Sequence, residues 1–143
     1  MLADQREVRT TQTYKVKVER IDEAHARSSV RDFSLTLGAR RADAQAGFNP
    51  VETLLSAVGD CLLTALDFVA QLSRVPIAAV ALEVEGERQD KPPILTQIRY
   101  VLRIASEATD ERLERVVDLA RANSTVFQTV SLAVPITGRW ERV

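Results

Sequence analysis

The chain has 143 residues and a mass of 15.9 kDa, which is the usual length of one domain. Apolar residues make up 45% of it, enough for a single modest core, so we expect one domain over residues 1–143. Nineteen Lys and Arg residues nearly balance twenty Asp and Glu residues. This balance excludes the one-sided basic surface that nucleic acid binding requires, so we expect no nucleic acid partner.

The opening segment MLADQREVRT carries charges within its first six positions and lacks the apolar stretch of a secretory signal. No run reaches the roughly 20 apolar residues of a membrane span, because polar residues interrupt the longest one. We therefore expect a soluble, cytoplasmic protein that does not contact membranes. The chain has one cysteine, Cys61, so oxidation of its thiol must involve another molecule or an oxygenated form of the sulfur.

Alternating apolar and polar residues predict strands in the first third of the chain. Residues 14–19 and 30–37 show this alternation, and the polar segment 21–29 lies between them. We expect these two strands to form a hairpin with a long turn. His25 lies in the polar segment and is expected to be solvated, which argues against a Cys–His pair or a histidine metal site.

A long helix is predicted to begin at Pro50. Asn49 suits the cap position, Pro50 the first helical position and Glu52 the capping-box position. Apolar residues within 51–72 cover more than one stripe, so we expect this helix to be buried on several sides. A helix that ends at Ser73 is roughly 35 Å long at 1.5 Å per residue and should be the central element.

The second half of the chain predicts another hairpin and further helices. Residues 80–87 and 95–104 alternate again, and the inward face of the second strand consists of Ile98, Tyr100, Leu102 and Ile104. Thr109 is expected to cap a shorter helix, segment 123–131 to form another helical piece, and 133–143 to form a final strand.

The order of these elements predicts an α+β fold. A two-stranded hairpin is marginal on its own, and a long helix that is apolar on several sides needs more cover than five strands provide. We therefore expect a homodimer.

Cys61 shares its helical face with mostly apolar residues, because the helical period places Leu54, Ala65 and Phe68 beside it. Apolar neighbours disfavour a thiolate, and Cys61 lies too far from the start of the helix for the helix dipole to help. It is therefore either a packing residue or a reactive thiol that a cation from elsewhere activates. An arginine of a loop or of a partner subunit is the simplest source of that cation.

The segment NPVETLLSAVGDC (residues 49–61) resembles the central-helix signature of the OsmC/Ohr family of hydroperoxide-reducing proteins. In this family a Pro and a Glu open the helix, and the peroxidatic cysteine follows eleven residues after the Pro, as Cys61 follows Pro50. The element order and the segment ANSTVFQTVSLAVPITG also fit. The resemblance implies an OsmC-like fold, with antiparallel sheets around a long central helix in an intertwined homodimer, and no metal or other cofactor.

The second cysteine of typical family members is missing from this chain. The stretch STVFQTV aligns with the family segment that begins with that cysteine, which places Ser124 at its position. A hydroxyl cannot form a disulfide. The resemblance therefore implies that oxidised Cys61 is reduced by an external thiol, such as a small dithiol or a lipoyl protein.

The resemblance also suggests residues that act with Cys61. In the organic-hydroperoxide branch a Glu directly follows the Pro and pairs with a catalytic arginine, whereas here Val51 takes that place and Glu52 comes one residue later. Glu52 remains a catalytic candidate, although nine residues at 100° place it on the helical face opposite Cys61 and favour the capping role. Arg20 is the first candidate for the arginine and Arg41 the second, and each can instead be a solvated surface charge.

Two functions of different classes follow from these observations. As a peroxidase in oxidative-stress defence, the protein would use Cys61 to attack an organic hydroperoxide, with an arginine stabilising the thiolate and the peroxide oxygen. As a binding module, the dimer would keep an apolar pocket for a small hydrophobic ligand and would have lost the redox cycle together with the second cysteine. The retained helix signature favours the peroxidase.

Overall fold

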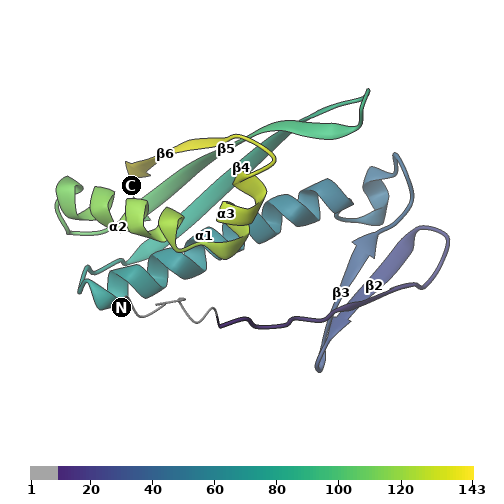
Figure 1. The fold of residues 1–143 in the computed structure, drawn as a ribbon, viewed down its shortest axis with the longest axis horizontal. Coiled ribbons are helices and arrows are strands. Elements are labelled where there is room, and N and C mark those ends of the chain that lie inside the picture. Colours follow the sequence, from purple (N-terminus) through teal and green to yellow (C-terminus); the bar gives the residue numbers. More distant parts are fainter. Residues whose placement is uncertain (1–9) are drawn as a thin grey trace, which may run out of the picture. The chain divides into compact units, whose positions relative to one another are not determined.

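A computed structural model describes residues 10–143, which form two compact units with their boundary between Asn49 and Pro50. In the described part of the chain, the amino-terminal unit contains three strands and a 3-10 helix, and the carboxy-terminal unit contains three strands and three α-helices (Figure 1). Antiparallel hairpins and separate helical segments confirm the α+β prediction. A single domain over residues 1–143 remains a prediction.

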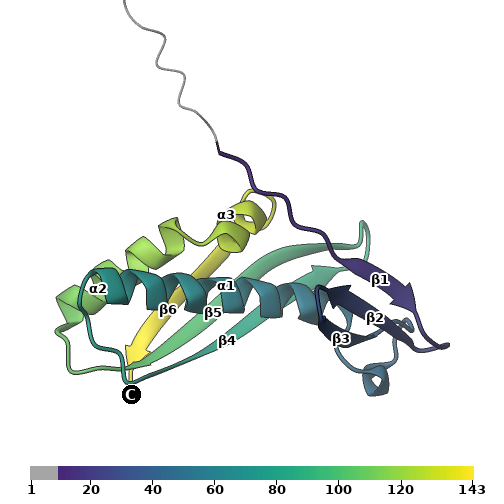
Figure 2. The same cartoon turned by 90° about the horizontal axis from the view of Figure 1, so that it is seen from below.

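The amino-terminal unit is a three-stranded antiparallel meander with the strands in chain order (Figure 2). Its elements are β1 (Lys17–Arg20), β2 (His25–Val30), β3 (Phe33–Gly38) and the 3-10 helix η1 (Ala44–Ala46). Val30 pairs with Phe33, so the turn between β2 and β3 has only two residues. Its first residue, Arg31, has a φ of 50°, and its guanidinium carbon lies 5.6 Å from the centre of the Phe33 ring.

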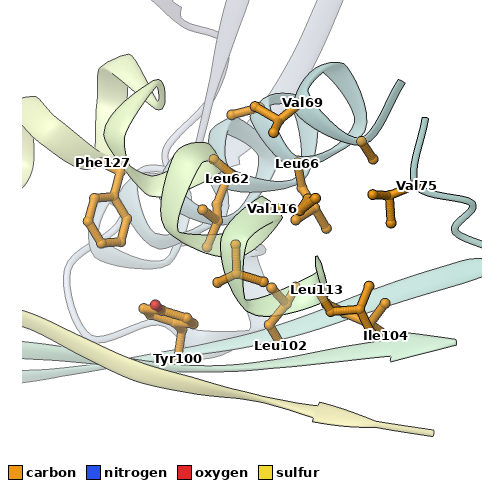
Figure 3. Close-up of a cluster of buried hydrophobic side chains, with 14 of the residues drawn as sticks. Leu62, Leu66, Val69, Val75, Tyr100, Leu102, Ile104, Leu113, Val116 and Phe127 are labelled. Atoms are coloured by element: carbon orange, nitrogen blue, oxygen red, sulfur yellow. The ribbon is translucent and has the colours of Figure 1, made fainter. Parts of the chain in front are cut away.

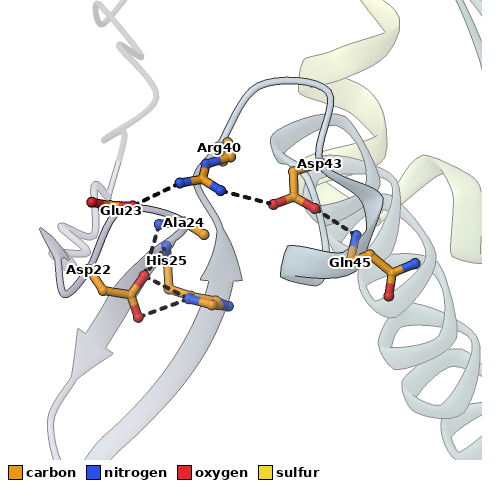
Figure 4. A network of polar contacts seen from close by, with 7 residues as sticks. All are labelled: Asp22, Glu23, Ala24, His25, Arg40, Asp43 and Gln45. Carbon is orange, nitrogen blue, oxygen red and sulfur yellow. Dashed lines mark hydrogen bonds and ion pairs between the residues drawn. The ribbon is translucent and has the colours of Figure 1, made fainter.

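The central strand β2 corrects the prediction that residues 21–29 are a polar link. The chain can turn tightly between β1 and β2 because an Asp22 side-chain oxygen accepts hydrogen bonds from the backbone N–H groups of Ala24 at 2.8 Å and His25 at 2.9 Å (Figure 4). These amides, first that of Ala24, and the His25 ring lower the pKa of the Asp22 carboxyl. His25 is likewise not simply solvated, since its Nδ1 lies 2.8 Å from Asp22 Oδ1.

One face of this meander is apolar. Residues directly opposite each other in antiparallel strands lie on the same face, and Val18 is opposite Ser28, which is in turn opposite Leu35. Val18, Phe33 and Leu35 remain 60%, 67% and 64% exposed. Within its own unit, the described part of this sheet therefore presents large exposed apolar side chains.

The carboxy-terminal unit places three helices on one face of a three-stranded sheet (Figures 1 and 2). Its elements are α1 (Pro50–Leu72), β4 (Ala79–Gln89), β5 (Ile94–Ala105), α2 (Asp110–Ala122), α3 (Thr125–Ser131) and β6 (Ile136–Arg142). The predicted start of α1 at Pro50 is confirmed, and its last residue is Leu72 rather than Ser73. The Thr109 side chain caps α2 by accepting the N–H of Arg112, as predicted.

The last strand, β6, pairs with β5 in parallel, whereas we expected antiparallel sheets. After β5 the chain crosses over through α2 and α3 before it returns to the sheet. A crossover of this length returns the chain to the end of the sheet where β5 began, which is the connection that parallel strands require. Alternation alone does not reveal this direction.

The core lies between the helices and this sheet (Figure 3). As predicted, Ile98, Tyr100, Leu102 and Ile104 are the buried side chains of β5. Leu62 and Leu66 of α1 lie against this layer, with Leu113 and Val116 of α2. A Cβ on Gly59 would lie 3.1 Å from Leu82 Cδ2, so this glycine allows α1 to approach β4 closely.

Helix α1 is buried on only one side within the chain. The helix is long and apolar enough to cross a membrane. The core helices of soluble proteins reach the same length and apolar composition. Its inner side supplies Val58, Leu62 and Leu66 to the core, while Phe68 and Leu72 are 59% and 70% exposed. The sequence predicted burial on several sides, and the carboxy-terminal unit provides it on one.

Helix α1 ends in a Schellman motif. Arg74 has a φ of 54°, Val75 N–H donates to the Ala70 carbonyl at 2.9 Å, and Arg74 N–H donates to the Gln71 carbonyl at 3.2 Å. The Arg112 guanidinium donates to the Arg74 carbonyl at 3.1 Å. A non-glycine residue therefore occupies the left-handed position that usually holds glycine.

We predict that Arg74→Gly stabilises the protein by about 0.5–1 kcal/mol, because the left-handed strain of a Cβ exceeds the entropy cost of glycine. Urea unfolding should show a higher midpoint with an unchanged slope. Arg74→Ala is the matched control, since it removes the same side chain and keeps the Cβ. A glycine variant that is no more stable than the alanine variant would contradict the prediction.

Candidate functional site

Cys61 lies in the middle of α1 and is partly buried. Its Sγ accepts a hydrogen bond from the backbone N–H of Val126 at a distance of 3.3 Å. Val126 is the second residue of α3, a helix of seven residues that Ser124 precedes as the N-cap. The structure therefore joins the middle of α1 to the first turn of α3 through the cysteine sulfur.

This donor was missed by reasoning from the helix of Cys61 alone, because Val126 is 65 residues away in the sequence. The family resemblance contained a signal for it, since it placed the second cysteine of typical members at Ser124. That alignment implies that the start of the short helix lies near Cys61. The structure places the two segments in contact, and the role of each residue remains a prediction.

Ser124 is fully buried, with 0% of its surface exposed. An N-cap hydroxyl normally accepts the N–H of the second or third helical residue, but Ser124 makes no such bond. Its Oγ has no hydrogen-bond partner, and it is the single buried side-chain oxygen or nitrogen of which this is true among the residues that the structure describes. The sulfur of Cys61 thus takes the place of the serine hydroxyl as the acceptor at the start of α3.

An unpartnered buried hydroxyl is energetically unfavourable by about 1–3 kcal/mol. Native proteins contain few such groups, and they occur where function requires them or where a partner is absent. Three polar groups lie at the start of α3: the sulfur of Cys61, the N–H of Val126 and the hydroxyl of Ser124, which has no partner among the described residues.

The arrangement gives the cysteine sulfur one backbone hydrogen-bond donor. A hydrogen bond donated to the charged form of a group favours that form, and the first-turn amides of a helix carry partial positive charge. The Cys61 sulfur therefore has a fixed hydrogen-bond donor inside its own unit. Leu54 and Phe68, seven positions away on either side, keep the helix surface beside it apolar.

Both candidate arginines belong to the amino-terminal unit. Arg20 is the last residue of β1, and its pairing with Ala26, which in turn pairs with Leu37, places it on the apolar face of the meander. Arg41 follows β3 and precedes η1. Their roles toward Cys61 remain predictions.

The loop that carries Arg41 is closed at its base. Gly38 N–H donates to the Phe48 carbonyl at 2.9 Å, and a Cβ on Gly38 would lie 3.1 Å from that carbonyl oxygen. The neighbouring Arg40 lies 3.1 Å from Glu23 and 3.9 Å from Asp43, as Figure 4 shows. Carboxylates thus neutralise Arg40, whereas the Arg41 side chain forms no ion pair with another described residue.

Glu52 lies in the first turn of α1, with an exposed side chain. Its capping and catalytic roles both remain predictions. No group of three or more His, Cys, Asp or Glu residues that could hold a metal ion occurs within residues 10–143.

Comparison with known families matches residues 41–138 to the OsmC-like protein family. The chain belongs to the OsmC-like family. No curated protein matches this OsmC-like chain.

Solved structures show the same fold. An OsmC-like protein from Mycoplasma pneumoniae is 20% identical, with a TM-score of 0.86 over 94% of this chain and 99% of that one. The organic hydroperoxide resistance protein OsmC from Legionella pneumophila is 15% identical, with a TM-score of 0.70 over 93% and 99% of the two chains. The organic hydroperoxide resistance protein OhrB of Bacillus subtilis is 19% identical, with a TM-score of 0.64 over 90% and 98%.

We predict that Val126→Pro slows alkylation of Cys61 by iodoacetamide at pH 7 by roughly 2- to 12-fold, the equivalent of one hydrogen bond to the reacting sulfur. Proline removes the N–H but is tolerated in the first turn of a helix. Val126→Ala, which loses similar packing and keeps the N–H, is the control. Equal rates in the two variants, with α3 intact by circular dichroism, would show that the amide does not influence the thiol.

Proposed function

We propose that this OsmC-like protein is a thiol-dependent peroxidase that reduces organic hydroperoxides through Cys61. The observation that carries the proposal is the 3.3 Å contact between Cys61 Sγ and the Val126 N–H, which favours a thiolate at the position of the family's peroxidatic cysteine. Two proteins of the same fold are named organic hydroperoxide resistance proteins. We further propose a role in oxidative-stress defence in the cytoplasm.

In the proposed reaction the Cys61 thiolate attacks the distal oxygen of the hydroperoxide. A sulfur–oxygen bond forms, the oxygen–oxygen bond breaks, and the alkoxide leaves and takes up a proton as the alcohol. The sulfur is oxidised by two electrons to the sulfenic acid, and the peroxide is reduced by two. An arginine, Arg20 first and Arg41 second, would stabilise the thiolate and the departing oxygen.

The apolar surroundings favour an organic peroxide over hydrogen peroxide. Leu54 and Phe68 lie along the same side of α1 as Cys61, and Phe68 is 59% exposed. Burial of an alkyl chain against such side chains contributes about 0.8 kcal/mol per methylene. Hydrogen peroxide gains nothing from this contact.

The sulfenic acid must be reduced from outside the chain. Ser124 occupies the position of the second cysteine and offers a hydroxyl, which cannot form a disulfide. An external thiol, from a small dithiol or a lipoyl protein, would attack the sulfur, release water and form a mixed disulfide that a second thiol resolves.

We also propose that the protein works as an intertwined homodimer with two sites. Two apolar surfaces support this assembly: the face of the meander with Val18, Phe33 and Leu35, and the outer side of α1 with Phe68 and Leu72. A second copy of the chain can cover both surfaces, and it can bring an arginine to Cys61.

We predict that equimolar cumene hydroperoxide converts reduced Cys61 to a species 16 Da heavier that dimedone traps. Intact-mass spectrometry measures the conversion, and Cys61→Ser is the control. An unmodified Cys61 would refute the peroxidase. If the protein then binds a fatty acyl or aromatic ligand equally well with and without the thiol, it is a binding module on the same fold.

We predict that Arg20→Ala lowers the rate of this oxidation about tenfold or more and shifts the midpoint of Cys61 alkylation to higher pH, because a cation that contacts a thiolate stabilises it. Arg41→Ala tests the second candidate, and Arg40→Ala, whose guanidinium is already paired with carboxylates, is the matched control. Wild-type rates in both the Arg20 and the Arg41 variants would exclude both candidates.

We predict that Ser124→Cys forms an intramolecular disulfide with Cys61 after mild oxidation, visible as a loss of 2 Da and of both free thiols. The expectation follows from the position of Ser124 beside the helical turn whose amide contacts Cys61. The double variant with Cys61→Ser keeps one thiol and serves as the control. Disulfide-linked oligomers in place of the internal disulfide would show that the two side chains point apart.

A further inference from the structure

The buried hydroxyl of Ser124 can donate a hydrogen bond that no described residue accepts. Its Oγ is fully buried and has no partner among the described residues. Buried polar groups in native proteins nearly always have a hydrogen-bond partner, so an acceptor for this hydroxyl is expected in another state of the protein. The acceptor must come close to the first turn of α3, because Ser124 is the N-cap of that helix.

The sulfur of Cys61 lies at the same turn. Ser124 directly precedes this turn as its N-cap, and the amide of the second helical residue, Val126, donates to Sγ at 3.3 Å. Ser124 and the sulfur therefore both lie at the start of α3, without a hydrogen bond between the hydroxyl and the sulfur. The reduced sulfur is satisfied by the amide, and the hydroxyl remains unused.

We infer that Ser124 is a positioning residue whose hydroxyl donates a hydrogen bond to the oxygen atom that Cys61 acquires on oxidation. This inference rests on the proposed function for the source of that oxygen. The oxidised side chain adds an oxygen acceptor next to Sγ, and a hydroxyl with no other partner is available to bind it. Val126 N–H keeps its bond to the sulfur or shares it with the new oxygen.

This contact has two chemical consequences. The hydroperoxide supplies the oxygen and leaves as the alcohol, and the hydrogen bond from Ser124 holds that oxygen at the start of α3. The same bond withdraws electron density from the sulfenate. It therefore slows attack on a second peroxide molecule, which would oxidise the sulfur by two more electrons to the sulfinic acid.

The test compares Ser124→Ala, Ser124→Thr and Thr125→Ala with the wild type. Cys61 is oxidised once with equimolar cumene hydroperoxide and, separately, with excess hydrogen peroxide. Intact mass follows the sulfinic form, 32 Da above the thiol, and dimedone follows the sulfenic form. We expect the alanine variant at position 124 to reach the sulfinic form roughly tenfold faster, threonine to restore the wild-type rate, and Thr125→Ala, which removes the next hydroxyl along the chain, to have no effect.

Stability provides a second readout. In the reduced state Ser124→Ala should unfold at the same temperature as the wild type or higher, because it removes a buried hydroxyl without a partner. In the sulfenic state it should unfold at a lower temperature than the oxidised wild type. A reduced variant that is clearly destabilised would show that the hydroxyl already has a partner, and would overturn the inference.

The outcomes separate this inference from the proposed function. If cumene hydroperoxide oxidises Cys61 and Ser124→Ala changes neither the sulfinic rate nor the oxidised stability, the inference fails alone. If only hydrogen peroxide produces a sulfenic form, and Ser124→Ala shortens its lifetime, the peroxidase proposal fails and the inference stands. If neither oxidant produces a sulfenic form, both fail.

Discussion

The hydrogen bond from the Val126 N–H to Cys61 Sγ connects two helices on which the candidate site depends. Cys61 cannot move far, because Leu62 beside it is buried in the core of the carboxy-terminal unit. Val126 is equally fixed, since the next residue, Phe127, is buried and meets Tyr100 edge-on with ring centres 6.0 Å apart. A single polar contact is therefore held in place by apolar packing on both sides.

An amide and an arginine would contribute differently to a reactive thiol. The Val126 N–H has a fixed position and carries no net charge, so it orients the sulfur through one hydrogen bond. A guanidinium brings a full charge on a flexible side chain, and water and salt screen its effect wherever the site is open. The two would be complementary, because the amide would define where a thiolate lies and an arginine would favour its formation.

Periodicity was sufficient to predict the elements that pack on the core. The start of α1 and the four inward residues of β5 follow from apolar spacing, since burial on one side enforces that spacing. Strand β2 was missed because its sequence, HARSSV, contains no large apolar side chain before Val30, and the strand is held in place by backbone pairing with β1 and β3. The contact between Cys61 and Val126 could not be derived from spacing, because it joins residues 65 positions apart and involves a backbone group, which no side-chain pattern reveals.

The exposed apolar side of α1 matters for the reactivity of Cys61 as well as for assembly. Leu54, Cys61 and Phe68 recur every seven residues, so the thiol lies within the same stripe of α1 whose apolar side chains remain exposed. A second copy that covers this stripe would bury apolar area and exclude water from the sulfur in one step. In a drier site the Val126 amide and an incoming guanidinium would both act more strongly on the thiolate. Dimerisation would then complete the site that one chain only begins.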